Sequence, residues 1–404
     1  MWYHLYEAQM QASAPFRAAA LAALKMKGAL NGSADTPFAR QMLATLEMAS
    51  RMQLTHARPP FFIDSVMVEN QEAMVTEEVA LSLPFGNLLH FKKDIQTPQP
   101  RVLLVAPLSG HFATLLAGTV KTLLQDHDVY ITDWKNARDV PLGAGRFGFE
   151  DYVDYLIRFL EELGPGAHLI AVCQPCVQAL TAASVMAEAR HPCEPKSLTL
   201  MAGPIDCRVN PTTVNNLATE HPIDWFKQNL ISTVPFPHPG WGRKVYPGFV
   251  QLTAFMSMNP QRHMDAHKEL YELLASGEEA AADKIKTFYD EYFAVLDLDA
   301  EFYIETVQWV FQEYRLALGT LTHRGKPVDP SHLRRTALLT VEGERDDICS
   351  VGQTSAAHDL ASKLRPHLRS HHLQPGVGHY GVCNGRKWES QIYPVVRSVI
   401  LAVE

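Results

Sequence analysis

The chain has no apolar run long enough to cross a membrane, and it lacks the uninterrupted apolar core of an export signal. Its first stretch, MWYHLYEAQMQASAPFRAAALAALKMKGAL, is broken by His4, Glu7 and Arg17. A membrane-spanning helix needs roughly 18 or more apolar residues in succession, and a signal peptide needs a shorter continuous one. We therefore expect no transmembrane segment and place the protein in the cytoplasm.

Cysteine and positive charge are also scarce. The six cysteines, at positions 173, 176, 193, 207, 349 and 383, form no dense framework, and we expect reduced thiols. Lysine and arginine total 36 against 44 aspartates and glutamates, which gives a net charge of −8. Because binding to phosphates depends on an excess of basic residues, this balance argues against a nucleic-acid partner.

Short apolar strands alternate with helices through the middle of the chain. Strands are predicted at 101–107, 128–134, 167–172, 197–206, 336–343 and 370–375, and helices at 149–164 and 174–189. Continuous apolar runs such as RVLLVAP are typical of strands that are covered on both faces. The alternation predicts an α/β protein with a doubly wound, mostly parallel sheet.

The domain organisation follows from where this alternation stops. Residues 1–57 are predicted to be an N-terminal helical extension, and residues 58–210 and 326–404 to be the two parts of the α/β core. Residues 211–325 are expected to form a helical lid, since an insertion after a late strand often covers a site at the strand carboxyl ends. Its clearest helical face is formed by Ile285, Phe288, Tyr289, Tyr292, Phe293 and Leu296.

The extension carries an apolar stripe of its own. We favour docking of this stripe on the core, with a lipid-like or polymer surface as the alternative. The stripe consists of Leu5, Met10, Phe16, Ala20, Leu21 and Leu24.

Cys173 lies between a predicted strand and a predicted helix, in the sequence A-V-C-Q-P. A nucleophile elbow, usually written G-x-S-x-G, has this position and small residues on both sides. The amino end of the following helix favours thiolate over thiol. We expect the backbone N–H of Gln174 to face a developing oxyanion, with a second donor from Leu108 or Ser109 in the loop after LLVAP.

An acid and a histidine follow in the order found in α/β-hydrolases. Asp346 and Asp347 come just after one strand, and His379 lies in a glycine-rich loop after the next. We prefer Asp346, three residues past Gly343, and leave Asp347 as the alternative. Together these residues predict an α/β-hydrolase fold with a Cys173–His379–Asp346 triad, in which histidine takes the thiol proton and the carboxylate orients the ring.

The Cys-Gln-Pro-Cys sequence has three other interpretations. It resembles a thioredoxin-type redox motif, it can supply half of a zinc site, or it can be two inert thiols. The motif stands late in the chain and no second C-x-x-C accompanies it, so we predict neither a metal nor a cofactor. Cys176 is expected to be a packing residue and His111 a structural one.

The chain resembles the intracellular poly(3-hydroxybutyrate) depolymerases over nearly its whole length. The motifs that carry the resemblance are YHLYEAQMQASAPFRAAA, PLSGHFATLLAGTV, VYITDWKNARDVPL, IAVCQPCVQAL, LMAGPID, VEGERDDICSVGQT and PGVGHYGVCNGRKW. The resemblance implies cleavage of the amorphous storage polyester to 3-hydroxybutyrate units or short oligomers, with Cys173, Asp346 and His379 as the catalytic residues. It also implies association with the apolar surface of storage granules. Position 176 departs from the family, because we would expect serine there.

Two alternatives to this function stay open. Polyhydroxyalkanoate synthases resemble this chain in having a cysteine triad on the same fold, but their elbow is G-x-C-x-G, and this chain has proline at the last position. The second alternative is a granule-binding protein without activity. The oligomeric state is also open, with a homodimer as one option.

Overall fold

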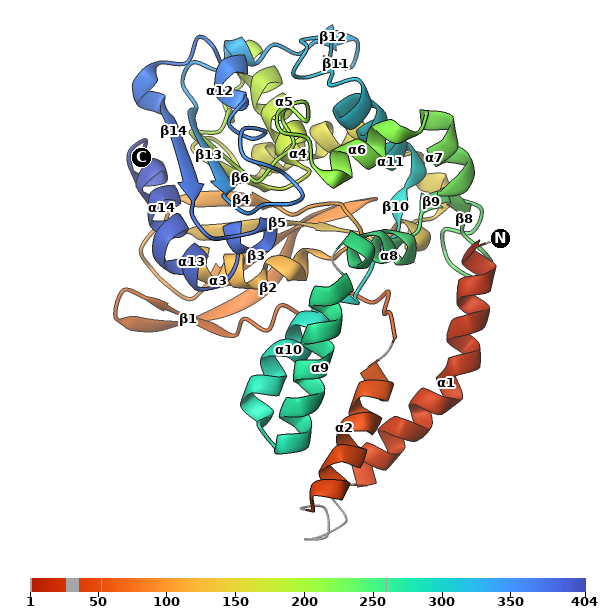
Figure 1. Ribbon diagram of the computed structural model, residues 1–404. Coiled ribbons are helices and arrows are strands. Elements are labelled where there is room, and N and C mark those ends of the chain that lie inside the picture. Colours follow the sequence, from red (N-terminus) through yellow and green to blue (C-terminus); the bar gives the residue numbers. More distant parts are fainter. Residues whose placement is uncertain (1, 27–35, 52, 259) are drawn as a thin grey trace.

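The computed structural model describes residues 2–26, 36–51, 53–258 and 260–404, and most of them surround one large twisted sheet (Figure 1). Within these residues the sheet has nine strands in the order β1-β2-β3-β5-β4-β6-β7-β13-β14. β1, β2 and β3 run antiparallel, whereas the strands from β5 to β14 are mutually parallel. The strands are β1 Ser65–Val68, β2 Gln71–Leu83, β3 Gly86–Lys93, β4 Arg101–Val105, β5 Asp128–Trp134, β6 His168–Val172, β7 Ser197–Met201, β13 Ala337–Gly343 and β14 Arg369–Gln374.

Helices cover both faces of the parallel strands. Leu103 and Val105 of β4 pack on the side of α4 (Phe149–Leu163) and α5 (Cys176–Glu188). Val102 and Leu104 point the other way, toward α3 (Ala117–Leu123) and α14 (Tyr393–Leu401). This alternation is the period of two of a strand whose two faces are both buried. The predicted doubly wound, mostly parallel sheet is confirmed, and its crossover order is that of an α/β-hydrolase.

The segment between β7 and β13 is mainly helical. Its elements are α6 Thr213–Glu220, α7 Ile223–Asn229, β8 Ser232–Thr233, β9 Lys244–Tyr246, α8 Gly248–Met258, α9 Pro260–Ser276, α10 Glu279–Tyr292, β10 Leu298–Asp299, α11 Ala300–Thr306, β11 Thr322–His323 and β12 Lys326–Pro327. α10 ends at Tyr292, so Leu296 lies beyond the helical face on which the periodicity had placed it. Short helices α12 (Ala357–Leu360) and α13 (Gly385–Lys387) flank the last strands.

A helical arm projects from the body. It consists of α1 (Trp2–Met26), α2 (Pro37–Arg51), α9 and α10 (Figure 1). The first turns of α1 are fixed to the body, because the Tyr3 hydroxyl donates to Asp297 Oδ2 over 2.6 Å and the Tyr6 ring stacks on Phe249 at 4.1 Å between centroids. Among the described helices, none combines the length and apolar character that a membrane span requires.

The favoured docking of the N-terminal stripe holds only in part. Of its residues Ala20 is buried and Met10 and Leu24 are half-buried, whereas Leu5, Phe16 and Leu21 are exposed. Tyr3, outside the predicted stripe, is the other buried residue of α1. The helix packs through small and aromatic residues, which a search for large aliphatic side chains does not weight. Residues 1, 27–35 and 52 of the predicted extension lie outside the described residues.

Candidate active site

Cys173 occupies a tight turn between β6 and α5. Its φ is 68°, in the left-handed region that costs energy for any residue with a Cβ. The turn is held by two backbone hydrogen bonds, from Cys173 N to Met201 O (2.8 Å) and from Cys176 N to Cys173 O (3.1 Å). The side chain is half-buried, at the carboxyl edge of the parallel strands. This is the strained strand-to-helix turn that the sequence predicts.

Close packing beneath the turn depends on Gly203. A Cβ at Gly203 would lie 2.2 Å from the Cβ of Cys176 and 3.2 Å from the carbonyl oxygen of Cys173. Cys176 is fully buried, and its Sγ donates to Ala171 O over 3.3 Å. The thiol of Cys176 therefore faces the core, and it forms no disulfide with Cys173.

The redox and zinc interpretations of Cys-Gln-Pro-Cys require a disulfide or a cluster of metal ligands, respectively. All six cysteines, each within the described residues, are free thiols. In the same part of the chain, no group of three or more histidine, cysteine and acidic side chains could hold a metal ion.

His379 and Asp346 meet at the same edge of the sheet. His379 Nδ1 lies 2.8 Å from Asp346 Oδ2, and with its proton on Nδ1 the ring donates to the carboxylate. The other carboxylate oxygen, Oδ1, accepts from the backbone of Ile348 (2.9 Å) and Cys349 (2.8 Å). Asp346 is buried, whereas Asp347 is exposed. Of the two candidate acids, Asp346 is thus the one that contacts the histidine.

Cys173 is within reach of the imidazole. Burial of His379 opposes its protonation, but the negative charges of Cys173 and Asp346 and side-chain hydrogen bonds with both residues outweigh burial, so the pKa of His379 is raised well above its usual range. A raised pKa of this origin favours the protonated imidazole. The structure therefore brings together the three predicted side chains Cys173, His379 and Asp346.

The predicted oxyanion donors differ in how they are engaged. Leu108 N donates to the side-chain oxygen of Gln174 over a long 3.4 Å. Among the described residues, neither Gln174 N nor Ser109 N has an acceptor. The N–H groups of Gln174 and Ser109 are thus not engaged by the described residues, whereas that of Leu108 makes one long hydrogen bond. The Gln174 Nε2 is buried without a hydrogen-bond partner in the described part of the chain.

An aromatic wall, which the sequence did not predict, stands beside the thiol. Burial raises the pKa of Tyr380 well above its usual range, and the nearby Tyr292 and Cys173 add to that rise. The rings of Tyr292 and Tyr380 lie 6.4 Å apart. Tyr292 O is also 3.2 Å from Nε2 of His111, whose ring stacks on Phe255 at 5.8 Å. His111 is buried in this wall, in keeping with a structural role. Adjacency to His379 was the signal that could have identified Tyr380.

The loop after β4, which contains the predicted oxyanion donors, is bonded to the two chain segments at the base of the arm. Leu296 N donates to Gly110 O over 2.9 Å, and His111 bridges to Val295. Val295 N in turn donates to Thr55 O over 2.8 Å. The segments that follow α2 and α10 are thus joined to each other and to the loop after β4.

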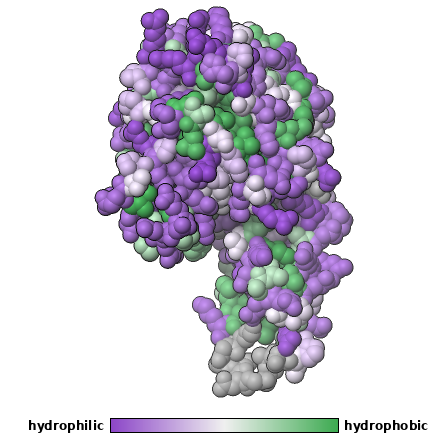
Figure 2. All heavy atoms as spheres, turned by 90° about the vertical axis from the view of Figure 1, so that its left-hand side faces the viewer, coloured by the Kyte–Doolittle hydropathy of each residue, from purple (hydrophilic) through white to green (hydrophobic). Residues whose placement is uncertain are grey.

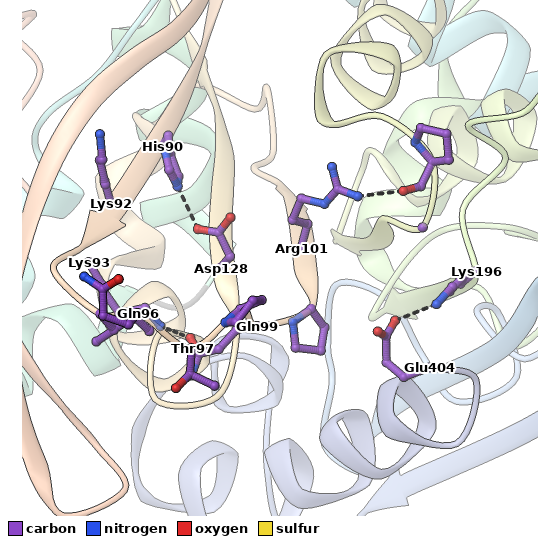
Figure 3. A pocket seen from close by; sticks show the side chains of 15 residues that line it. His90, Lys92, Lys93, Gln96, Thr97, Gln99, Arg101, Asp128, Lys196 and Glu404 are labelled. Atoms are coloured by element: carbon purple, nitrogen blue, oxygen red, sulfur yellow. Dashed lines mark hydrogen bonds and ion pairs between the residues drawn. The ribbon is translucent and has the colours of Figure 1, made fainter.

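A separate cavity of about 660 Å³ opens at the opposite edge of the sheet (Figure 3). It lies at the amino ends of β4 and β5, next to Arg101 and Asp128. Its cationic side chains are already engaged: Arg101 donates to Pro165 O over 2.6 Å, and Lys196 pairs with Glu404 at 3.0 Å. Because its charges are satisfied internally and it is remote from Cys173, it is not the candidate site.

Comparison with known proteins links the chain to one family. Residues 202–404 match the protein-family model described as "PHB de-polymerase C-terminus". This match takes in Asp346 and His379 and begins beyond Cys173. Among curated proteins, none matches the chain.

Several solved structures are similar in shape. A putative lipase (lip1) from Acinetobacter baumannii AYE is 15% identical, with a TM-score of 0.45, over 81% of this chain and 93% of that one. A monoacylglycerol lipase from Paleococcus ferrophilus is 13% identical, with a TM-score of 0.43, over 76% of this chain and 97% of that one. An esterase from Thermogutta terrifontis is 12% identical, with a TM-score of 0.41, over 84% of this chain and 98% of that one.

Proposed function

The chain belongs to the poly(3-hydroxybutyrate) depolymerase family of α/β-hydrolases, and from this premise we propose that it hydrolyses the polyester of cytoplasmic storage granules through an acyl intermediate on Cys173. Membership of this family makes the protein a carboxylic ester hydrolase. The identity of the nucleophile, the acyl-cysteine and the granule are the finer parts of the proposal.

One observation carries the choice of Cys173. His379 is bonded to Asp346 on one side, and on the other its pKa responds to the charge and the hydrogen bond of Cys173. A nucleophile, a base and a group that orients the base, connected in this sequence, are what acyl transfer requires. The position of Cys173 on a left-handed turn, directly before the N–H of Gln174, supports the same assignment.

The reaction would proceed in two halves. His379 takes the proton of Cys173, and Sγ attacks the carbonyl carbon of an ester in the polymer, whose oxygen becomes an oxyanion held by the N–H groups of Gln174 and Ser109. The bond from that carbon to the alcohol oxygen then breaks, His379 protonates the departing alkoxide, and the acyl group stays on sulfur. Water, deprotonated by His379, attacks the carbonyl carbon of the acyl-cysteine, the bond from that carbon to sulfur breaks, the hydroxyacid leaves, and His379 returns the proton to the thiolate. Asp346 stabilises the imidazolium in both halves.

The lid is a further part of the proposal. α8 packs closely on the oxyanion loop, since a Cβ at Gly110 would lie 2.7 Å from Gln251 Cγ, and Phe255 of the same helix stacks on His111. A cover that excludes water would strengthen the contacts to the oxyanion and hold an apolar chain. Phe255→Ala should lower polymer turnover more than turnover of p-nitrophenyl butyrate. Equal losses on the two substrates would contradict a lid.

Mass spectrometry after brief exposure to a hydroxybutyrate oligomer tests the nucleophile directly. We expect the acyl group on the peptide that contains Cys173, and no adduct in Cys173→Ala. Cys176→Ala is the matched control, because it removes a neighbouring thiol that faces the core, and it should still be acylated. Acylation of the Cys173→Ala variant, or of a serine elsewhere, would refute the assignment.

Product analysis separates hydrolysis from the two alternatives. A depolymerase releases 3-hydroxybutyrate units or oligomers from amorphous granules, whereas a synthase consumes hydroxyacyl-CoA and releases free CoA. A protein that only binds granules would show neither reaction. Loss of turnover in Cys173→Ala with retained granule binding would exclude the purely binding role.

A further inference from the structure

One face of α1 is an exposed apolar stripe that no described part of the chain covers. Its large members are highly exposed: Trp2 by 62%, Leu5 by 60%, Phe16 by 69% and Met26 by 62%. The residues that complete the stripe at intervals of three and four are small or uncharged. The docking stripe consists of Trp2, Leu5, Gln9, Ala12, Phe16, Ala19, Ala23 and Met26.

The spacing makes the stripe one continuous surface. Residues three and four apart lie above one another on a helix, and α1 runs over 25 residues, which is a length of roughly 37 Å at 1.5 Å per residue. No charged side chain interrupts the stripe. Exposed apolar surface in this quantity marks a binding site more often than a free surface.

The helix is held in place while the stripe faces outward. Besides the buried bond from Tyr3 to Asp297, Glu7 lies 2.6 Å from Nε2 of His238. Farther along, Ala20 is buried at one edge of the stripe, and α1 packs against α2. The neighbouring helix α2 adds two exposed apolar side chains, Phe38 (74%) and Met42 (52%). Figure 2 shows further hydrophobic side chains on the side of the arm that faces away from α1 in Figure 1.

The stripe is poorly suited to a second copy of the chain. Its spacing matches the a and d positions of a coiled coil, in which charged residues at the flanking e and g positions set register and partner. Here those positions carry no charge, and one of them is a proline. They are Tyr6, Ser13 and Ala20 on one side and Ala8, Pro15 and Ala22 on the other. Alanines at three of the eight stripe positions also leave little to fill a partner's holes.

A lipid surface fits no better. Helices that lie on membranes usually carry many lysines and arginines on the polar face, which attract anionic headgroups. α1 has Arg17 and Lys25 against Glu7. The stripe is apolar and uncharged, and its flanks do not fix the position of a partner helix. It therefore fits a partner surface that is apolar, uncharged and uniform along its length.

We propose that the docking stripe of α1 binds the surface of an amorphous aliphatic polyester and thereby holds the enzyme on its solid substrate. This inference rests on the proposed function, because it takes the polymer of that reaction as the partner. The stripe lies on the arm, apart from Cys173. Docking and catalysis are therefore separable by mutation.

A double variant, Leu5→Gln with Phe16→Gln, tests the inference. Glutamine has nearly the helix propensity of leucine, so α1 should persist. The probe is amorphous poly(3-hydroxybutyrate) particles, with bound protein measured by sedimentation. Each replacement removes a large side chain from the contact, and we expect the partition coefficient to fall about tenfold or more. Turnover of the soluble ester p-nitrophenyl butyrate should stay within about twofold, which also reports that the protein is folded.

The matched control is Met67→Gln with Leu401→Gln. These side chains are exposed to a similar degree, by 54% and 53%, but they lie on β1 and α14 of the body. The control should bind particles as the parent does. If the α1 variant binds equally well, or the control loses as much, the inference is wrong.

Two further outcomes, a dimer interface on α1 and failure of the proposed function, can be distinguished from loss of docking. If analytical ultracentrifugation shows a parent dimer that the α1 variant dissociates while particle binding is unchanged, the stripe is an interface between copies and the inference is wrong. If the parent protein hydrolyses neither polymer nor soluble ester, the proposed function fails. In that case, a selective loss of particle binding in the α1 variant would still support docking.

Discussion

Replacing Asp346 by asparagine should inactivate the enzyme without unfolding it, because the local hydrogen bonds dictate how the new amide must point. Oδ1 of Asp346 accepts from Ile348 N and Cys349 N, and only the carbonyl oxygen of asparagine can take over that role. The NH₂ group would then face His379 Nδ1 and donate to it. The imidazole is thereby forced to carry its proton on Nε2, toward Cys173, and cannot accept the thiol proton.

The expected loss in kcat follows from that wrong tautomer. In triads of this kind the same change costs about 10⁴-fold, which corresponds to about 5.5 kcal/mol of barrier. Loss of the carboxylate charge also lowers the pKa of His379, since that charge helps to raise it. Asp347→Asn is the matched control: its side chain is exposed, and we expect less than about a threefold effect on kcat.

Turnover of p-nitrophenyl butyrate, thermal unfolding and ¹⁵N NMR of the His379 side chain make up the assay. Asp346→Asn should unfold near the parent temperature, show its imidazole proton on Nε2, and lose most of its kcat. Retention of more than a tenth of parental activity, or an equal loss in Asp347→Asn, would refute the reasoning.

Gly203→Ala should destabilise the fold by about 1–3 kcal/mol, because the new Cβ would lie 2.2 Å from that of Cys176. By displacing Cys173 it should also lower kcat about 100-fold. Gly143→Ala, which has nothing within 4 Å of its new Cβ, should be neutral in urea unfolding, and equal effects at both glycines would contradict the packing argument. Burial lowers the pKa of His111 from 6.5 to about 4, so the unfolded chain binds the extra proton first and stability falls as pH decreases from about 6.5 to about 4. Relative to His111→Gln, the loss should reach about 3 kcal/mol; parallel unfolding curves at pH 7 and pH 4.5 would contradict it.

The sheet could be predicted because its strands carry their signal locally. Runs such as 101–105 and 168–172 are apolar throughout, as strands covered on both faces must be. The helix over 149–164 was equally clear, since α4 ends where Gly164 adopts a φ of 77°. Prediction failed in part on α1, because Ala20 of the predicted stripe is buried, together with Tyr3, while Leu5 and Phe16 face outward.

The candidate site shows the same division between local and distant information. The elbow at Cys173 and the order of Asp346 and His379 follow from turns that each lie next to a strand. Tyr292 could not be placed beside Tyr380 from sequence, because that contact depends on how the inserted helices return to the core. The bond from Leu108 to the Gln174 side chain is also invisible in the sequence, since it depends on one rotamer.

Two backbone hydrogen bonds join Thr55 to the segment after α10. Deleting the N-terminal extension would therefore affect the structure of the body. Cutting the chain after position 57 would remove the acceptor of Val295 N and the donor to Phe293 O. Those bonds hold the segment in place, and its next residue, Leu296, donates a hydrogen bond to Gly110 O. A shortened protein would thus lose two bonds that support a loop more than fifty positions downstream of the cut, whose Leu108 contacts the side chain of Gln174, the residue after Cys173.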